Sequence, residues 1–168
     1  MQILETSRLT LRYITSRDAE ALMPILGDAE VMQFSIIGVH SKKQIKQFIE
    51  QRLISYLEYG FGLYAIVHKQ NQELIGYCGF FIQSIEQQKE VEVGYRLARK
   101  YWGQGLATES AKAVVEYGQQ RFNFQRFVCL IETENSRSIR VANKLGMTLE
   151  KKIIYHGLDV AMYSLNCQ

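Results

Sequence analysis

The feature that most constrains the fold is a strand pattern that runs through a short basic loop directly into a helix pattern. The strand covers residues 90–98, the loop is Lys100-Tyr101-Trp102-Gly103-Gln104-Gly105, and the helix follows over residues 104–121. The first N–H groups of a helix lack carbonyl partners and carry partial positive charge. Glycine lets the backbone approach a ligand without an intervening Cβ. The segment therefore predicts a cradle for an anion, and a pyrophosphate suits such a cradle.

Hydrophobic periodicity predicts further elements on both sides of this segment. Strands are predicted over residues 8–15, 62–69, 73–83, 126–133, 147–155 and 159–166, and helices over residues 16–26, 42–58 and 135–146. Ser16 is expected to cap the first helix, Pro24 to kink it or end it early, and a second short helix to follow Asp28. This order predicts an α+β fold with a mixed, mostly antiparallel sheet of about seven strands, helices on both faces and one strand–helix–strand crossover.

The composition favours a single globular domain over residues 1–168. Of these residues 47% are hydrophobic and 22% are charged, and no apolar run is long enough to cross a bilayer. The net charge of +3 is low for a nucleic-acid binder, but it suits one local anion site. Three cysteines in no metal-binding spacing predict reduced thiols and no metal. Together with the lack of an export pattern at the N-terminus, they predict a cytoplasmic protein without membrane or nucleic-acid partners.

Three known phosphate-binding loops can be compared with the glycine-containing segment. The P-loop pattern is absent, and the dinucleotide pattern G-x-G-x-x-G has Thr108 in place of its third glycine. The pattern [Arg/Gln]-x-x-Gly-x-[Gly/Ala] fits best, and with it the chain resembles the GNAT superfamily of acyl-CoA-dependent N-acetyltransferases. Three more blocks match the branch that acetylates ribosomal-protein N-termini: Glu5 to Arg12, Glu92 to Tyr95, and Asn135-Ser136-Arg137-Ser138 with Ala142 to Met147. Lys100 and Met147 depart from the usual Arg or Gln and Phe.

The resemblance implies that acetyl-CoA lies in a V-shaped opening between two parallel strands, which end near Leu97 and Glu134 and are splayed by a bulge in the first. It implies that backbone groups of Arg96 and Leu97 pair with the pantetheine. The loop after Lys100 would hold the pyrophosphate through the amides of Gly103, Gln104, Gly105, Leu106, Ala107 and Thr108. Asn135 would bind pantetheine or an ordered water while capping the last helix. Arg137, Arg140 and Lys144 share one helix face and either meet the 3′-phosphate or form a solvated basic face.

The resemblance also assigns candidate catalytic residues. Glu92 matches the family's strand carboxylate at the base position; the alternative is an ordinary exposed strand residue. Ser138 matches the serine that the N-terminal-acetylating branch is thought to use as the acid; the alternative is a structural residue of the first helical turn. Many family members carry a tyrosine acid where this chain has Ala142. The segment Asp28 to His40 is expected to line the acceptor pocket.

The sequence thus predicts an enzyme that moves an acetyl group from acetyl-CoA directly to a primary amine. The acceptor is either a protein N-terminal amine or a small-molecule amine, and the chain is a monomer or a homodimer. No nucleophile motif predicts an acyl-enzyme. A dinucleotide-dependent oxidoreductase using Gly103-Gln104-Gly105 is one alternative, disfavoured by the single crossover. A non-catalytic coenzyme A-binding module of the same fold is another, disfavoured by the presence of Glu92.

Overall fold

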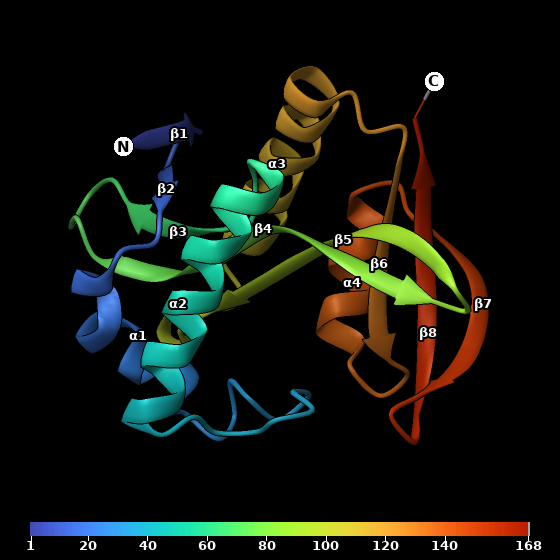
Figure 1. The fold of residues 1–168 in the computed structure, drawn as a ribbon, viewed down its shortest axis with the longest axis horizontal. Helices are drawn as coiled ribbons and strands as arrows, with labels where there is room; N and C mark the ends of the chain where they lie inside the picture. The colour runs from blue at the N-terminus through green and yellow to red at the C-terminus, as the bar shows by residue number, and fades with distance from the viewer. Residues whose placement is uncertain (168) are drawn as a thin grey trace.

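One continuous sheet of eight strands forms the centre of the computed structural model, which describes residues 1–167 (Figure 1). The strands are β1 (Gln2–Glu5), β2 (Leu9–Tyr13), β3 (Leu63–His68), β4 (Leu74–Ile85), β5 (Gln88–Leu97), β6 (Arg126–Glu132), β7 (Thr148–Tyr155) and β8 (Leu158–Asn166). Their order across the sheet is β1-β2-β3-β4-β5-β6-β8-β7. Every neighbouring pair is antiparallel except β5 and β6, which the crossover through α3 makes parallel. The predicted mixed, mostly antiparallel sheet is confirmed.

Four α-helices cover the two faces of the sheet: α1 (Ala19–Leu26), α2 (Lys42–Tyr59), α3 (Leu106–Phe122) and α4 (Ser136–Lys144). Phe48 of α2 packs on Tyr77 of β4 with ring centroids 5.2 Å apart. A Cβ at Gly118 of α3 would lie 2.7 Å from the ring of Phe80, so α3 approaches β4 closely at this glycine. Because Tyr77 and Phe80 are three residues apart in one strand, they face opposite sides, and so do α2 and α3.

The N-terminal region differs from the sequence prediction in two places. Strand β1 was not predicted, because four residues are too short to show alternation; it forms by pairing with β2. The first helical cap is Thr15 and not Ser16. Residues 16–18 form a 3₁₀ turn before α1, and the Thr15 N–H donates to Asp18 at 2.7 Å while Arg12 holds the same carboxylate at 2.8 Å. Pro24 lies inside α1, which continues to Leu26 as predicted, so the expected early stop does not occur.

The short helix expected after Asp28 is absent. Residues 29–34 instead form consecutive turns, because the Asp28 carboxylate accepts hydrogen bonds from the N–H groups of Glu30 and Val31. The chain then continues to Ser41, which forms the capping box of α2 with Gln44. The segment 28–40 is thus irregular and is held by side-chain contacts.

Strands β5 and β6 part without the bulge that the family resemblance implied. The two strands share only the pair Glu92 and Val128, whereas β5 pairs with β4 from end to end without a register shift. Strand β6 pairs equally continuously with β8. Each strand therefore stays with its outer neighbour, and the twist of the sheet separates the two inner edges.

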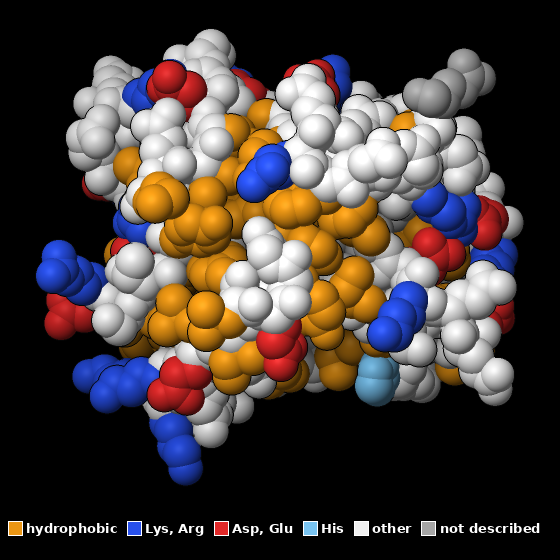
Figure 2. Space-filling model, turned by 45° about the horizontal axis from the view of Figure 1, so that its top comes forward, with side chains coloured by type: hydrophobic (Ala, Val, Ile, Leu, Met, Phe, Trp, Pro, Cys, Tyr) orange, Lys and Arg blue, Asp and Glu red, His pale blue; other side chains and the backbone are white. Residues whose placement is uncertain are grey.

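The main core lies between the sheet and its helices and includes fully buried Tyr64, Phe80 and Phe127. Figure 2 shows one face on which apolar side chains gather in the centre and most charged side chains lie toward the edges. Within residues 1–167, no helix is long and apolar enough to cross a membrane. In the same residues, no three His, Cys, Asp or Glu side chains are grouped so that they could hold a metal ion.

Candidate active site

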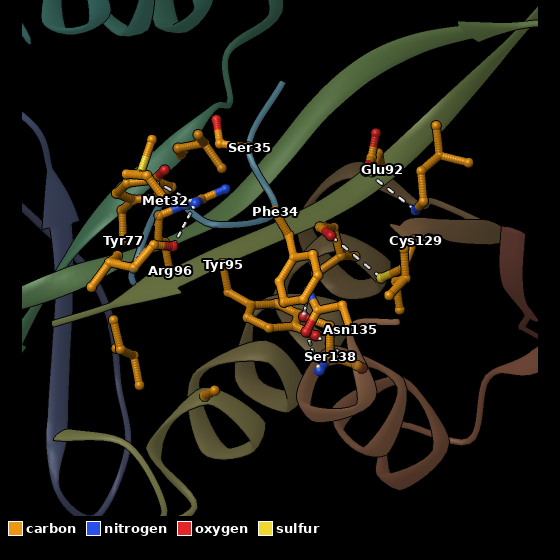
Figure 3. Close-up of a pocket in the computed structure, with 18 of the residues that line it drawn as sticks. Met32, Phe34, Ser35, Tyr77, Glu92, Tyr95, Arg96, Cys129, Asn135 and Ser138 are labelled. Carbon is orange, nitrogen blue, oxygen red and sulfur yellow. Dashed lines mark hydrogen bonds between the residues drawn. The ribbon is translucent and has the colours of Figure 1, made fainter. Parts of the chain in front are cut away.

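The parting of β5 and β6 opens a cleft of about 980 Å³. Its walls come from both strands, the first turns of α3 and α4, one side of α2 and the segment 28–40. In Figure 3, Glu92 and Cys129 lie at one end, Asn135 and Ser138 near Tyr95, and Met32, Tyr77 and Arg96 at the other end. Beyond Glu92 the edge of β5 has no β6 partner, so its outward backbone groups can pair with a ligand.

The loop that begins α3 presents six consecutive N–H groups without a protein partner. Gly103 and Gly105 have φ of 73° and 77°, a conformation that favours glycine. The first helical hydrogen bond runs from the Glu109 N–H to the Gly105 carbonyl at 3.0 Å, and no amide from Gly103 to Thr108 donates within the described chain. A Cβ at Gly103 would meet no atom within 4 Å. The loop therefore has both the donors and the space to hold a pyrophosphate.

Two polar contacts hold this loop from outside the cleft. The Lys100 ammonium pairs with Glu73 at 2.6 Å, and Glu73 also accepts from the Tyr101 hydroxyl at 2.6 Å. The structure therefore does not bring the Lys100 side chain to the cleft. The Gln104 side chain also turns away, donating to the Lys100 carbonyl at 3.1 Å, so only the backbone of Gln104 is available for a phosphate.

Arg8 is a site residue that sequence reasoning missed. Its guanidinium donates to the Gln104 carbonyl at 2.9 Å and pairs with Glu109 at 2.6 Å. It thereby fixes the glycine loop against the start of α3. The contact spans about a hundred residues of sequence, so no local pattern could reveal it.

Glu92 is buried at the floor of the cleft, with only 7% of its surface exposed. Its carboxylate accepts hydrogen bonds from Gln83 Nε2 at 2.9 Å and from the Leu130 N–H at 3.3 Å. Burial raises the pKa of Glu92 to about 7, while these two hydrogen bonds act in the opposite direction. Glu92 is thus not the exposed strand residue of the alternative interpretation.

Asn135 and Ser138 form one unit at the start of α4. The Asn135 side chain accepts from the Ser138 N–H at 3.3 Å and donates to Ser138 Oγ at 3.1 Å. Within residues 1–167, Ser138 Oγ donates to no protein acceptor, so its hydrogen remains available to the cleft. The Tyr95 hydroxyl donates to the Ser138 carbonyl at 3.2 Å and joins this turn to β5. Position 142, where many family members carry the tyrosine acid, holds a fully buried alanine, and alanine has no hydroxyl to offer the cleft.

The basic residues of α4 lie along the same cleft. Arg137 lies over the Trp102 ring, 3.6 Å from its centroid, so this cation of α4 is in contact with the loop that precedes α3. Arg140 and Lys144 line the cleft and take part in no salt bridge within the described residues. The Trp102 indole donates to the Leu97 carbonyl at 2.9 Å, which leaves one lone pair of that oxygen for a ligand.

A sheet that parts at its one parallel pair, with free amides at the following helix start and a buried carboxylate on the parting strand, defines an acetyl-CoA-dependent N-acyltransferase. The chain belongs to the acetyltransferase (GNAT) domain family, whose model matches residues 8–148. The oxidoreductase alternative is therefore wrong, since a dinucleotide fold needs a doubly wound parallel sheet.

Relatives cover nearly the whole chain. The uncharacterized protein YkkB of Bacillus subtilis is 35% identical over 161 residues, which are 95% of this chain and 93% of YkkB. The uncharacterized N-acetyltransferase p20 of Bacillus licheniformis is 33% identical, covering 98% and 96% of the two chains. A Salmonella typhimurium acetyltransferase that modifies the N-terminal serine of 50S ribosomal subunit protein L7/L12 has the same fold, with a TM-score of 0.86, 23% identity and full coverage of both chains. The structure of RimL, a ribosomal L7/L12 alpha-N-protein acetyltransferase in complex with coenzyme A, gives a TM-score of 0.84. The two sequences are 24% identical, and the match covers 99% of this chain and 98% of RimL.

Proposed function

We propose that this protein acetylates a primary amine by direct transfer from acetyl-CoA, with Glu92 as the base and Ser138 as the acid. The observation that carries this proposal is that Glu92 lines the same cleft as Gly103, Gly105 and the first residues of α3, whose amides have no protein partner. The amides can hold a doubly charged diphosphate, and the carboxylate can take the proton that the amine loses. The acceptor is a protein N-terminal amine or a small-molecule amine.

The residues present fit acetyl-CoA, which supplies an activated acetyl thioester when bound. The amides of Gly103 to Thr108 would hold the pyrophosphate, and the open edge of β5 at Leu97 would pair with a pantetheine amide. The backbone of Arg96 does not take the part that the family resemblance implied, because it faces Tyr77 of β4 in the alternating antiparallel ladder. Asn135 would contact the pantetheine or a water. Arg137 and Arg140 would meet the 3′-phosphate, because both line the same cleft and neither has a carboxylate partner among the described residues.

Glu92 would accept a proton from the amine, directly or through a water. A free α-amino group titrates near 8, so a carboxylate whose pKa is about 7 is matched to the proton it receives. The amine nitrogen then forms a bond to the acetyl carbonyl carbon while the carbon–sulfur bond breaks. Gln83 and the Leu130 N–H keep the carboxylate pointing into the cleft.

Ser138 would stabilise the leaving thiolate through its free hydroxyl hydrogen and pass it a proton. A thiol titrates near 8.5, so the leaving group needs only a hydrogen bond or a relayed proton. Asn135 Nδ2 donates to Ser138 Oγ and so holds the hydroxyl in place. Tyr95 holds the backbone of the same residue.

Direct transfer is favoured because the cysteine in this cleft is unsuited to carry the acetyl group. Burial raises the pKa of the Cys129 thiol well above its ordinary value, and its Sγ donates to the Val93 carbonyl at 3.3 Å. The thiol is therefore protonated and already engaged.

The test is release of free thiol from acetyl-CoA with a panel of peptides and small amines, with mass spectrometry of the products. The proposal expects one amine class to gain an acetyl group in step with thiol release. Coenzyme A binding without turnover of any amine would contradict it and favour a non-catalytic coenzyme A-binding module.

A further inference from the structure

The part of the cleft between α2 and the segment 28–40 contains two arginines without an acidic partner. Arg52 and Arg96 both line the cleft, and neither forms a salt bridge within residues 1–167. The Nε atom of each is buried and has no hydrogen-bond partner. Three acidic residues line the cleft, and none of them pairs with Arg52 or Arg96. Glu30 forms a salt bridge with Arg99 at 2.6 Å, and Glu92 accepts a hydrogen bond from Gln83. Glu132 is the last residue of β6.

The two arginines are connected through two aromatic rings. Arg96 and Tyr77 are cross-strand partners on β5 and β4, so their side chains lie on the same face of the sheet. Tyr77 packs against Phe48, and the Arg52 guanidinium lies over the Phe48 ring, 5.0 Å from its centroid. Burial lowers the pKa of Arg52, and no carboxylate is among the groups that oppose this shift.

Each arginine keeps a donor open to the cleft. The Nη atoms of Arg52 make no hydrogen bond to the described residues and are not enclosed. Arg96 uses Nη1 to hold the Val31 carbonyl at 2.9 Å, which fixes the segment 28–40, and its Nη2 remains free. A half-buried cation without a counter-ion is costly, and an anionic group on a ligand would relieve that cost while giving charge-assisted hydrogen bonds.

The spacing from Glu92 limits what this ligand can be. Glu92 and Arg96 are four residues apart on one face of β5, which places their Cα atoms about 13 Å apart. The carboxylate of an α-amino acid lies too close to its amine to reach both residues. An extended peptide advances about 3.5 Å per residue, so a side chain at its second or third position covers this range.

The shape of the cleft also suits a peptide. The residues of α2 that line it run from Gln44 to Tyr59, a length of about 22 Å along the helix. Between them, Gln47, Gln51 and Ser55 offer neutral donors and acceptors that can pair with a peptide backbone.

We propose that Arg52 and Arg96 bind an Asp or Glu side chain at the second or third position of a peptide whose N-terminal amine is acetylated. This inference rests on the proposed function, because it takes Glu92 as the point where the amine lies. It assigns the acceptor as an acidic peptide N-terminus and excludes polyamines.

The test compares peptides that differ only in carrying Glu or Gln at the second, third or sixth position. Both kcat/KM and the affinity for the coenzyme A-loaded protein are measured. Glu at the second or third position should raise both by about tenfold or more, and Glu at the sixth should not. Arg52→Gln should reduce this preference to near unity. Lys46→Gln, which removes an exposed cation of the same helix outside the cleft, should preserve it.

Two results would overturn the inference: equal binding of Glu and Gln peptides, or a preference that survives in both Arg52→Gln and Arg96→Gln. Acetylation of small amines with no peptide bound would also overturn it. Charge-selective peptide binding without any turnover would support the arginine site and contradict the proposed function instead. Thermal melting of each variant separates loss of the site from loss of the fold.

Discussion

Glu92 on β5 accepts a hydrogen bond from the Leu130 N–H on β6 at 3.3 Å, so the proposed base lies where the two strands begin to part. The contact uses an amide that a continuous parallel ladder would have paired with a carbonyl. The opening that admits the thioester thus also supplies a donor that orients the carboxylate.

Glu92 should set the acid limb of the pH–rate profile. Because only the ionised carboxylate accepts a proton and burial raises its pKa to about 7, wild-type kcat/KM should rise through neutral pH. Glu92→Gln should lower the rate at neutral pH by about 100-fold and recover in part at high pH, where more of the amine is neutral. Rates measured from about pH 6 to about pH 9.5 test this. An equal loss at every pH would remove Glu92 as the base.

Replacing the donor beside Glu92 gives a companion test. Gln83→Leu removes a hydrogen bond that lowers the pKa of Glu92, so the midpoint of the pH–rate profile should move upward. A midpoint that stays in place would show that another group controls it.

Glu92 should also make stability depend on pH. Its folded-state pKa lies above the ordinary value of 4.5, so the folded protein retains a proton that the unfolded chain loses between these two values. Stability should therefore fall as pH rises through that window, by about 3 kcal/mol for a displacement of this size. In urea unfolding, Glu92→Gln should gain stability over wild type at about pH 8 and little at about pH 4. A constant difference between the two proteins would contradict the raised pKa.

Ser138→Ala should slow turnover by about tenfold or more with little change in coenzyme A affinity, because the hydroxyl acts on the leaving sulfur. The side chain of Ser138 also accepts from Asn135, so stability should fall slightly. Ser136→Ala, an exposed change in the same helical turn, is the matched control. The test is a rapid-quench measurement of the rate of the chemical step in Ser138→Ala. A wild-type rate in this variant would show that Ser138 has only a structural role.

Arg140 should contribute to binding through the 3′-phosphate. Arg140→Gln should weaken coenzyme A by about five- to tenfold and leave 3′-dephospho-coenzyme A unaffected, since the latter lacks the group that Arg140 would meet. Lys112→Gln, outside the cleft on α3, controls for net charge. If Arg140→Gln weakened the binding of both ligands equally, Arg140 would not contact the 3′-phosphate and would belong to a solvated basic face.

The parts of the site that sequence reasoning reached are those set by local chain geometry. Gly103 and Gly105 lie directly before a helix, so their amides are free wherever the helix packs. Asn135 is followed by its own capping partner, Ser138, three residues later. Such features depend on a few consecutive residues, and the family's motifs record them.

The remaining features depend on contacts that no local pattern contains. Arg8 reaches the glycine loop only because β2 and the start of α3 meet in space. The segment after Asp28 is turned locally by its Asp28 hydrogen bonds, but its position on the cleft is held by Arg96, which donates to the Val31 carbonyl across 65 residues of sequence. The sequence also could not show that Arg52 lacks an acidic partner, because this depends on which side chains surround it in the folded protein.

The central claim, that the amides from Gly103 to Thr108 grip the pyrophosphate, is tested most directly by calorimetric titration of coenzyme A into Gly105→Glu. The new side chain starts 3.6 Å from Arg8 Nη2, strains a residue at φ 77° and places a negative charge beside the loop amides. Affinity should therefore fall by about 100-fold or more, which is about 2.7 kcal/mol. Gly157→Glu, at φ 77° in the β7–β8 turn, introduces the same backbone strain far from the loop and should bind like wild type. Wild-type affinity in a folded Gly105→Glu protein would contradict the account.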